Sequence, residues 1–374
     1  MLDVLVVQRR MTHYRIPFFQ ALKKECAQRN MRLHVAYGGS TPEESIKNDE
    51  SELDWGVRLP TRYFLKGKLC YQPFAKIAAD KKLIVLTPEN KLINNLATQF
   101  LNKKIRVVLW GHGANLQGNP KSFREKFKRI VAKKADWWLG YTQMSMSLIT
   151  ASGFPKNRIT ILNNSVDTTE LRQMKYAVQP ETLQDLQQNY EIKGECVGVF
   201  IGSLYGEKRI PFMLEAVKAI QKQLPHFEFL VIGSGPHKNL IEDFAQQHSW
   251  VKYFGPLKGQ EKVNIVTMAH VMINPGLVGL GILDSFVCEV PMITTDCNLH
   301  SPEISYIAHG ENGLMVKNTQ SDYVNAVVEL FNDQPMLMKL QKGCAESAQQ
   351  YTVENMAKNF AEGLQQCLDT PFYR

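Results

Sequence analysis

The sequence lacks any cysteine pairing pattern and any long apolar run, and both absences narrow its class. Its seven cysteines are odd in number, scattered over 374 residues, and never spaced as Cys-x-x-Cys. A disulfide framework or a structural zinc site is therefore not expected. No apolar stretch approaches the roughly 20 residues that cross a bilayer, and the first residues lack the pattern of a signal peptide. We expect a cytoplasmic chain with reduced thiols.

The composition has neither the polarity of a disordered chain nor the bias of a repetitive one. Apolar residues make up 44% and charged residues 21% of the sequence, which excludes disorder, collagen-like repeats and coiled coil. At roughly 150 residues per domain, the length predicts at least two globular domains.

Acidic residues are scarce in the first half of the chain. Residues 1–175 hold 30 basic and 14 acidic side chains, a balance of +16, whereas residues 176–374 hold 14 basic and 22 acidic, a balance of −8. A basic half attracts anionic lipid surfaces, phosphorylated substrates or polyanions, and charge alone does not choose among them.

Short apolar runs followed by amphipathic stretches recur along both halves, which is typical of βα units with a parallel sheet. The runs are Val4–Val7, Leu33–Ala36, Leu83–Leu86, Arg106–Leu109, Trp137–Gly140 and Ile159–Leu162 in the first half, and Val197–Ile201, Glu228–Ile232, Val251–Phe254, Val271–Ile273, Met292–Thr294 and Leu314–Val316 in the second. They predict an α/β protein of two Rossmann-like, doubly wound domains. Ligands of such sheets bind at the carboxyl ends of the strands, so we expect an interdomain cleft.

The predicted boundaries follow from a polar stretch between the two sets of strands. We assign residues 1–178 to an N-terminal domain, 179–193 to a linker, and 194–350 to a C-terminal domain. Residues 351–374 form a terminal helix that would pack back across the first domain.

Residues 274–316 are the most informative stretch. A strand ends at Asn274, a loop with Gly276, Gly279 and Gly281 follows, and a helix begins near Leu280. Glycines before a helix allow a phosphate to approach backbone N–H groups, and the helix dipole favours its charge. Asp284, one turn into that helix, would accept hydrogen bonds from ribose hydroxyls. The alternative interpretation is a turn with an ordinary helix-dipole partner.

This stretch resembles the donor-binding domain of the family-4 retaining glycosyltransferases, which have the GT-B fold of two facing Rossmann-like domains. Their pattern is Glu-Gly-Phe-Gly-x-x-x-x-Glu, followed by Cys-Gly-x-Pro-Val. Here Asp284 falls on the second glutamate, and Cys288-Glu289-Val290-Pro291 falls on the second element. Pro302-Glu303-Ile304 and residues 310–314 resemble the family's Pro-Glu-Ile and Gly-x-x-Gly-Leu.

Further segments resemble the family in the same order. Residues 200–204 with Glu207-Lys208-Arg209 are similar to Gly-Arg-Leu followed by Glu-Lys-Gly; residues 231–236 resemble Val-Gly-x-Gly-Pro; and residues 162–167 resemble Pro-Asn-Gly-Val-Asp. Two positions differ: Gly276 replaces the first family glutamate, and Ser203 replaces the arginine that binds the diphosphate. The resemblance implies that Lys208 and Arg209 supply the charge.

The resemblance and the predicted strand ends together give the candidate site. Lys208, Asp284 and His112, which follows the strand Arg106–Leu109, are the candidate catalytic residues. The candidate donor-binding residues are Gly202, Ser203, Lys208, Arg209, Gly233, Gly276, Gly279, Leu280, Gly281, Asp284 and Glu303. Arg9, Arg10, His13, Tyr14 and Arg15, in the loop after the first strand, are candidates for an anionic acceptor.

Neither a dinucleotide cofactor nor a metal is expected. The segment Gly233-Ser-Gly235-Pro lacks the third glycine of the dinucleotide fingerprint, and no Asp-x-Asp pair is present to chelate a metal-bound diphosphate. The nucleotide sugar would be a substrate, so no cofactor is predicted.

Residues 121–134 have the pattern of a basic amphipathic helix. Phe123, Phe127, Ile130 and Val131 share one face, opposite lysines and an arginine. Such helices lie on anionic membranes, although a helix that buries its apolar face on the sheet is the favoured interpretation. The two interpretations are compatible if only the lysines contact lipid.

The predicted function is a retaining, metal-independent glycosyltransferase that moves a sugar from a nucleoside-diphosphate sugar to an acceptor hydroxyl. The acceptor would be a lipid-linked or phosphorylated glycan in bacterial surface-polysaccharide assembly, including lipopolysaccharide, at the inner face of the membrane. The alternative is a catalytically degenerate nucleotide-sugar-binding or scaffold protein. A GT-B epimerase or phosphorylase ranks below both, and nucleic-acid binding ranks last.

Overall fold

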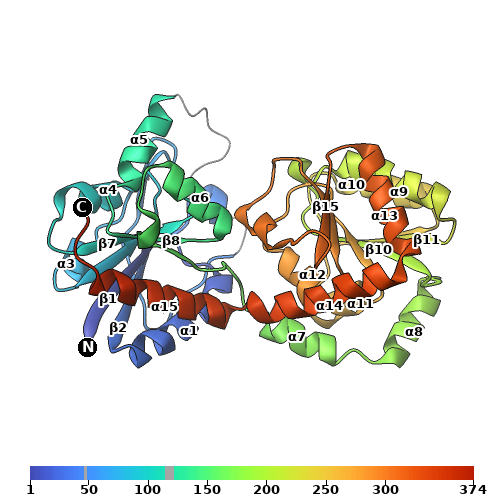
Figure 1. The fold of residues 1–374 in the computed structure, drawn as a ribbon, viewed down its shortest axis with the longest axis horizontal. Coiled ribbons are helices and arrows are strands. Elements are labelled where there is room, and N and C mark those ends of the chain that lie inside the picture. The colour runs from blue at the N-terminus through green and yellow to red at the C-terminus, as the bar shows by residue number, and fades with distance from the viewer. Residues whose placement is uncertain (46–48, 114–121) are drawn as a thin grey trace. The chain divides into compact units, whose positions relative to one another are not determined.

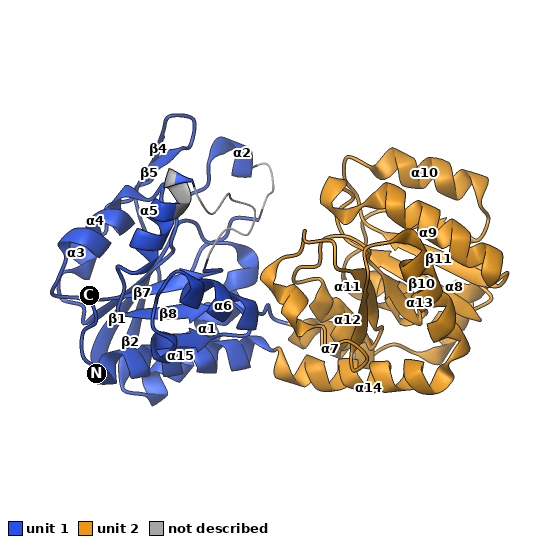
Figure 2. Cartoon of the chain, turned by 45° about the horizontal axis from the view of Figure 1, so that its top comes forward, with its two compact units in different colours: residues 1–167, 352–374 blue, residues 168–351 orange. Residues whose placement is uncertain are grey.

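The chain folds into two compact units, coloured separately in Figure 2. The computed structural model describes residues 1–45, 49–113 and 122–374, without the side chains of residues 123–125. Unit 1 consists of residues 1–167 and 352–374, and unit 2 consists of residues 168–351.

Unit 1 contains a parallel seven-stranded sheet in the order β3-β2-β1-β6-β7-β8-β9. Its strands are β1 (Leu2–Gln8), β2 (Met31–Tyr37), β3 (Val57–Arg58), β6 (Leu83–Leu86), β7 (Arg106–Gly111), β8 (Trp137–Gly140) and β9 (Ile159–Ile161). A separate antiparallel hairpin is formed by β4 (Arg62–Phe64) and β5 (Leu69–Tyr71). The helices are α1 (Ile16–Gln28), α2 (Pro42–Ser45), α3 (Ala75–Ala78), α4 (Ile93–Leu101), α5 (Phe123–Ala132), α6 (Gln143–Ala151) and α15 (Val353–Asp369).

Helices cover both faces of this sheet because its central strands are apolar on both sides. Along β1, Val4 and Val6 belong to one buried cluster, and Leu5 and Val7 belong to the other. This alternation follows from the two-residue period of a strand. Helix α15 packs beside α1 on the first face, as Figure 1 shows.

Unit 2 contains a parallel six-stranded sheet in the order β12-β11-β10-β13-β14-β15. Its strands are β10 (Cys196–Ile201), β11 (Phe227–Ile232), β12 (Val251–Tyr253), β13 (Val271–Ile273), β14 (Met292–Thr295) and β15 (Gly313–Val316). Its helices are α7 (Thr169–Tyr176), α8 (Pro180–Asn189), α9 (Ile210–Gln223), α10 (Lys238–Gln247), α11 (Gly259–Thr267), α12 (Ile282–Cys288), α13 (Gln320–Asn332) and α14 (Gln334–Gln350).

Each sheet has one topological switch point, where the strand order reverses. It lies between β1 and β6 in unit 1 and between β10 and β13 in unit 2. Loops that leave neighbouring strands in opposite directions open a crevice at the carboxyl ends, where ligands of doubly wound sheets bind. Most of the predicted donor residues follow β10 or β13 at this switch point, whereas Gly233 follows β11 and Glu303 lies beyond β14.

The unit boundaries differ from the predicted domain boundaries. The chain passes from unit 1 to unit 2 at residue 168, and the predicted linker 179–193 lies inside unit 2, where residues 180–189 form α8. The polar sequence of that segment reflects an exposed helix that starts with Pro180 at its first turn. The terminal segment, from residue 352 onward, belongs to unit 1.

No described helix is long and apolar enough to cross a membrane. Within the same residues, no group of three or more His, Cys, Asp or Glu side chains is arranged to hold a metal ion.

Candidate functional site

Two loops at the switch point of unit 2 are packed directly against each other. The N–H of Leu277 donates to the carbonyl of Glu207 at 2.8 Å, and Lys208 Nζ donates to the carbonyl of Leu277 at 2.6 Å. A side chain at Gly276 would place its Cβ 2.5 Å from the Glu207 carbonyl oxygen. The glutamate of the family pattern therefore has no space at position 276.

Glycines also form the wall beside these loops. Gly233 has φ of +149°, and a Cβ there would lie 1.9 Å from the carbonyl oxygen of Gly202. Gly202 has φ of +149° as well, and a Cβ there would lie in ordinary contact with Lys208, at 3.8 Å from its Nζ. Backbone, rather than side chains, thus lines the edge of the sheet here, which suits close approach by a ligand.

Lys208 is a largely buried ammonium group without an acidic partner among the described residues. It follows β10 in a short 3-10 turn, Gly206–Lys208, and its printed hydrogen bond goes to a backbone carbonyl. Burial lowers the pKa of Lys208 to about 8. A buried cation with no counterion is costly, so this position is prepared for an anion.

Arg209 is a second cation for which the described residues provide no carboxylate partner. Its Nη1 donates to the carbonyl of Pro275 at 3.1 Å, to Thr295 Oγ1 at 3.0 Å and to Asn318 Oδ1 at 2.6 Å. Its guanidinium carbon also lies 4.0 Å from the centre of the Phe212 ring. Arg209 has φ of +56°, a left-handed conformation that costs a non-glycine residue on the order of 1 kcal/mol. The family has glycine at this position. The arginine found here gives the site a second positive charge, and its backbone is strained where glycine would not be.

Asp284 lies at the third position of α12 and is already paired. Its Oδ1 accepts from Lys262 Nζ of α11 at 2.6 Å. The pair holds the carboxylate in place at the edge of the site and neutralises its charge. Leu280 is partly buried and Gly281 is exposed, and α12 begins at Ile282 rather than near Leu280.

The remaining predicted donor residues differ in exposure. Ser203, at the arginine position of the family pattern, is exposed. Glu303 is buried at 3% exposure in the 3-10 turn Pro302–Tyr306, beyond β14. Gly279 would place a Cβ 3.5 Å from Ser301 Oγ, so that position tolerates a small side chain.

The sequence analysis missed His300, which braces the glycine loop. The N–H of Val278 donates to His300 Nδ1 at 3.1 Å, and His300 Nε2 lies 2.7 Å from the carbonyl oxygen of Thr295. These contacts require Nδ1 to accept and Nε2 to donate, which defines the neutral tautomer. The signal was its position three residues before Glu303, inside a segment that resembles the family.

Cys297 lies beside this histidine and differs from the other thiols. Its Sγ is 3.5 Å from His300 Nε2. Burial opposes its ionisation, but hydrogen bonds from His300 and from the Leu299 backbone outweigh burial and lower the pKa of Cys297 to about 7. Burial raises the pKa of the other six cysteines, all of which the structure describes, and four of them reach about 12.

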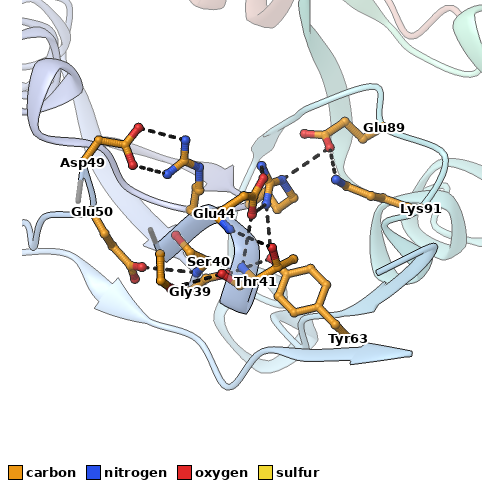
Figure 3. A network of polar contacts seen from close by, with 12 residues as sticks. Gly39, Ser40, Thr41, Glu44, Asp49, Glu50, Tyr63, Glu89 and Lys91 are labelled. Atoms are coloured by element: carbon orange, nitrogen blue, oxygen red, sulfur yellow. Dashed lines mark hydrogen bonds and ion pairs between the residues drawn. The ribbon is translucent and has the colours of Figure 1, made fainter. Parts of the chain in front are cut away.

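In unit 1, the first two predicted acceptor residues are bound to carboxylates. Arg9 donates to both Glu44 oxygens at 2.7 Å and lies 3.4 Å from Glu89, across the switch point between β1 and β6. Figure 3 shows Glu44, Tyr63 and Glu89 converging from separate segments. The hydrogen bond from Arg9 lowers the pKa of Glu44 to about 2.

Arg10 is held in the same way, by two hydrogen bonds to Asp49 at 2.6 and 3.0 Å. Both guanidinium groups therefore fasten the segment between β2 and β6 to the end of β1. Neighbouring carboxylates balance the charge of both residues, and their predicted role in binding an anionic acceptor stays a prediction.

His13, Tyr14 and Arg15 lie at the same edge in three different environments. His13 and Tyr14 are exposed, whereas Arg15 is buried at 8% exposure. Arg15 donates to Asn164 Oδ1 at 3.1 Å from both terminal nitrogens, and its guanidinium lies 5.2 Å from the Trp110 ring centre.

His112 follows β7 directly, as predicted, and is exposed. Its ring centre lies 4.3 Å from that of Tyr141, edge to face. Tyr141 also faces Arg15, at 5.9 Å from the guanidinium carbon to the ring centre. The structure therefore brings His112 and Arg15 together around one aromatic ring at the carboxyl edge of the unit 1 sheet.

Comparison with protein families gives a match over most of unit 2. Residues 195–333 match the model of the family described as glycosyl transferases group 1. The match includes the loops after β10 and β14, in which Lys208 and His300 lie, and helix α12 with Asp284. It does not extend to unit 1.

Two curated proteins are similar over part of this chain. The alpha-monoglucosyldiacylglycerol synthase of Acholeplasma laidlawii is 22% identical over 54% of the chain and 50% of its own length. The GtfA subunit of the UDP-N-acetylglucosamine–peptide N-acetylglucosaminyltransferase of Streptococcus parasanguinis is 26% identical over 41% of the chain and 30% of its own length. The alignments thus span half or less of these relatives.

Solved structures are similar over nearly the whole chain. The Anabaena HepE structure in complex with UDP has a TM-score of 0.68 at 14% identity, covering 98% of this chain and all of that one. A glycosyltransferase from Rickettsia africae has a TM-score of 0.69 at 14% identity, covering 99% of both chains. The protein has the GT-B fold. In this GT-B chain, the family match falls on the second of the two Rossmann-like units.

Proposed function

We propose that this protein is a retaining, metal-independent glycosyltransferase that moves a sugar from a nucleoside-diphosphate sugar to an acceptor hydroxyl. Unit 2 holds the donor and unit 1 holds the acceptor. The observation that carries the proposal is Lys208, a buried ammonium without an acidic partner at the switch point of unit 2. The family match over residues 195–333 and the UDP complex of the structurally similar HepE support a nucleotide-sugar donor.

The two loops provide the chemistry that such a donor requires. When the bond between the sugar's C1 and the diphosphate oxygen breaks, negative charge develops on the leaving diphosphate, and preorganised cations and N–H groups there lower the barrier. Lys208, Arg209 and the backbone at Gly279 and Gly281 fill this role. The acceptor oxygen bonds to C1 on the face that the diphosphate leaves, and its proton passes to the departing phosphate oxygen. No carboxylate nucleophile is then needed, which agrees with the lack of space for one at Gly276.

In this proposal, Asp284 and Glu303 also belong to the donor site, with Glu303 binding the sugar or the nucleotide. Asp284, fixed by Lys262, accepts hydrogen bonds from the ribose hydroxyls. In unit 1, His112, exposed at the end of β7, is the proposed catalytic-site histidine. The proposed acceptor is a lipid-linked glycan of bacterial surface-polysaccharide assembly at the cytoplasmic face of the membrane. The glycolipid synthase among the relatives supports a lipid acceptor.

The first test combines binding with turnover. Thermal shift against UDP, GDP, ADP and CMP and their sugar conjugates should identify one nucleotide, because a ligand at 100 times its Kd adds about 2.7 kcal/mol of stability. Hydrolysis or transfer of that sugar is then measured in two ways. The anomeric configuration of the product, determined by NMR, tests the retaining assignment, and activity in the presence of EDTA tests the metal-independent assignment. Binding without turnover of any sugar, with acceptor glycolipids present, would favour the scaffold alternative.

Cys297 offers a reporter for the site. Because its pKa is about 7 and those of the other cysteines are raised, iodoacetamide at pH 7.5 should modify Cys297 first, with bound donor slowing the reaction. Peptide mass spectrometry measures the rate at each cysteine. Cys297→Ser is the control that removes the fast phase. Modification unaffected by saturating donor would place the donor elsewhere.

His300 should control donor affinity rather than the chemical step. His300→Ala leaves the Val278 N–H without its acceptor, so the glycine loop loosens and donor Kd should rise about tenfold, since one buried unsatisfied group costs about 1–3 kcal/mol. His300→Asn retains an acceptor in place of Nδ1 and should recover part of the loss. Calorimetry gives Kd, and single-turnover rates at saturating donor give the chemical step. If the wild type, His300→Ala and His300→Asn bound the donor with equal Kd, His300 would not control donor affinity.

A further inference from the structure

Unit 1 exposes a set of large apolar side chains on three neighbouring elements. They lie on the β4–β5 hairpin, on the outer side of α4 and on α5. The set consists of Phe64, Leu65, Tyr71, Ile93, Phe100, Leu101 and Ile130. The most exposed are Leu101 at 80%, Leu65 at 69% and Ile130 at 52%. Ile130 was expected to be buried against the sheet with Val131, but Val131 is buried and Ile130 is exposed.

Hydrogen bonds join the three elements into one surface. The N–H of Cys70 in β5 donates to the carbonyl of Lys91 at 2.8 Å, and the N–H of Gln72 donates to Asn94 Oδ1 of α4 at 2.9 Å. At the other end of α4, Gln99 Nε2 donates to the carbonyl of Val131 in α5 at 3.1 Å. The hairpin and these helices lie on the same side of unit 1 in Figure 2. We call this surface the apolar–basic face.

The apolar residues on α4 form a stripe rather than a random scatter. Ile93, Ala97, Phe100 and Leu101 are exposed at intervals of four, three and one along a helix that contains no charged residue. That spacing describes one helical face, and in a soluble helix such a face normally packs inward. Here the inward face is formed by polar Asn95 and Gln99, which are buried and bonded to backbone carbonyls.

Basic residues far outnumber acidic residues along the segments that carry these apolar side chains. Residues 55–79 contain five basic and no acidic side chains, and residues 90–135 contain eleven basic and one acidic. The exposed cations on the described part of this face are Arg62, Lys66, Lys68, Lys103, Lys104, Lys126, Arg129, Lys133 and Lys134. At the hairpin tip, Leu65, Lys66 and Gly67 form a tight turn, with φ of +51°, +54° and +79° respectively.

We propose that the apolar–basic face docks unit 1 onto an anionic lipid bilayer. The proposal rests on the proposed function, in which the acceptor is lipid-linked, and it identifies the surface that meets the lipid. Exposed Leu, Ile and Phe side chains enter the boundary between headgroups and acyl chains, and the surrounding lysines and arginines bind anionic headgroups. A second copy of the chain is disfavoured as the occupant, because a two-fold contact would bring the same basic surface together twice. Nucleic acid would account for the cations but not for the apolar stripe.

The test is co-sedimentation of the full chain with phosphatidylcholine vesicles and with vesicles containing one quarter phosphatidylglycerol, at 0.1 M salt. The wild type should pellet with the anionic vesicles and remain in solution with the neutral ones. Leu65→Gln combined with Leu101→Gln should lower the partition coefficient at least tenfold, as should Lys66→Glu combined with Lys68→Glu. Met338→Gln, an equally exposed apolar residue in unit 2, is the matched control and should pellet like the wild type.

The proposal would be overturned if the wild type did not pellet with anionic vesicles, or if the Leu65/Leu101 variant pelleted like the wild type. It would also be overturned if sedimentation velocity showed that the main effect of the Leu65/Leu101 variant is a loss of self-association. Donor binding, measured without vesicles, should be unchanged in all variants and shows that they are folded. It also separates the two proposals, because a protein that binds vesicles but no nucleotide sugar retains the docking surface and loses the proposed function.

Discussion

Lys208→Ala is expected to reduce turnover of the nucleotide sugar by two to three orders of magnitude and to weaken diphosphate binding strongly. The reason is that Lys208 brings a desolvated charge to the position where the leaving group becomes more negative, and groups of this kind are worth about 100- to 1000-fold. Single-turnover kinetics and calorimetry with the nucleoside diphosphate measure the two effects. Lys218→Ala, an exposed lysine on the following helix α9, is the matched control and should leave both unchanged.

The same residue predicts a pH dependence. Burial lowers the pKa of Lys208 to about 8, from 10.5 for an ordinary lysine. Without ligand, the folded protein releases this proton near pH 8 while the unfolded chain keeps it, so the contribution of Lys208 to stability rises between pH 8 and 10.5. A bound diphosphate favours the charged form, so donor affinity should be constant below pH 8 and fall above it, with proton uptake on binding. If affinity in Lys208→Ala falls over the same range, another group is responsible.

Asp136→Ala is expected to destabilise unit 1 by about 3–5 kcal/mol, because it leaves a buried arginine without its partner. Asp136 is 1% exposed, and its Oδ2 accepts from Arg374 Nε at 2.8 Å and from the Val107 N–H at 2.9 Å. Nη1 and Nη2 of the same guanidinium donate to backbone carbonyls of the segment from Thr98 to Ile105. Unfolding in urea, followed by the tryptophan fluorescence of unit 1, measures the change.

An exposed ion pair provides the control for this prediction. Lys342 and Glu346 are 80% and 70% exposed and lie 3.9 Å apart. Glu346→Ala should therefore change the free energy of unfolding by less than about 1 kcal/mol. If Asp136→Ala and Glu346→Ala lowered the free energy of unfolding by similar amounts, burial would not explain the contribution of Asp136 to stability.

The twelve predicted strands are all present, with ends within two residues, because buried parallel strands are short runs of apolar residues between polar turns. The elements that were not predicted lack this signal. Strand β3 has two residues, and β4 and β5 form an exposed hairpin stabilised by contacts with Arg9 and Gln72 rather than by an apolar run. Helix α8 was taken for a linker because its residues are polar and none is buried.

For the site, sequence spacing located the loops but not the partners of their side chains. Lys208 and the glycines follow strands, so topology brings them together at the switch point. The pairing of Asp284 with Lys262 joins positions 22 residues apart on two helices, and that of Arg9 with Glu44 spans 35 residues. Such pairs depend on tertiary packing, which a single sequence does not display. The pairing of Arg9 and Arg10 with carboxylates was therefore not predicted.

The participation of α15 in unit 1 has a consequence for biosynthesis. Phe360, Leu364 and Met356 from this helix are fully buried in the same cluster as Val4 and Phe18. A ribosome delivers residues 1–167 first, but their core stays incomplete until residues 353–369 have left the exit tunnel. Unit 2, which is continuous in the chain, can finish folding earlier. Chaperones that recognise exposed apolar surface should therefore engage the nascent chain mainly through the α1 side of unit 1, and stay until α15 has emerged.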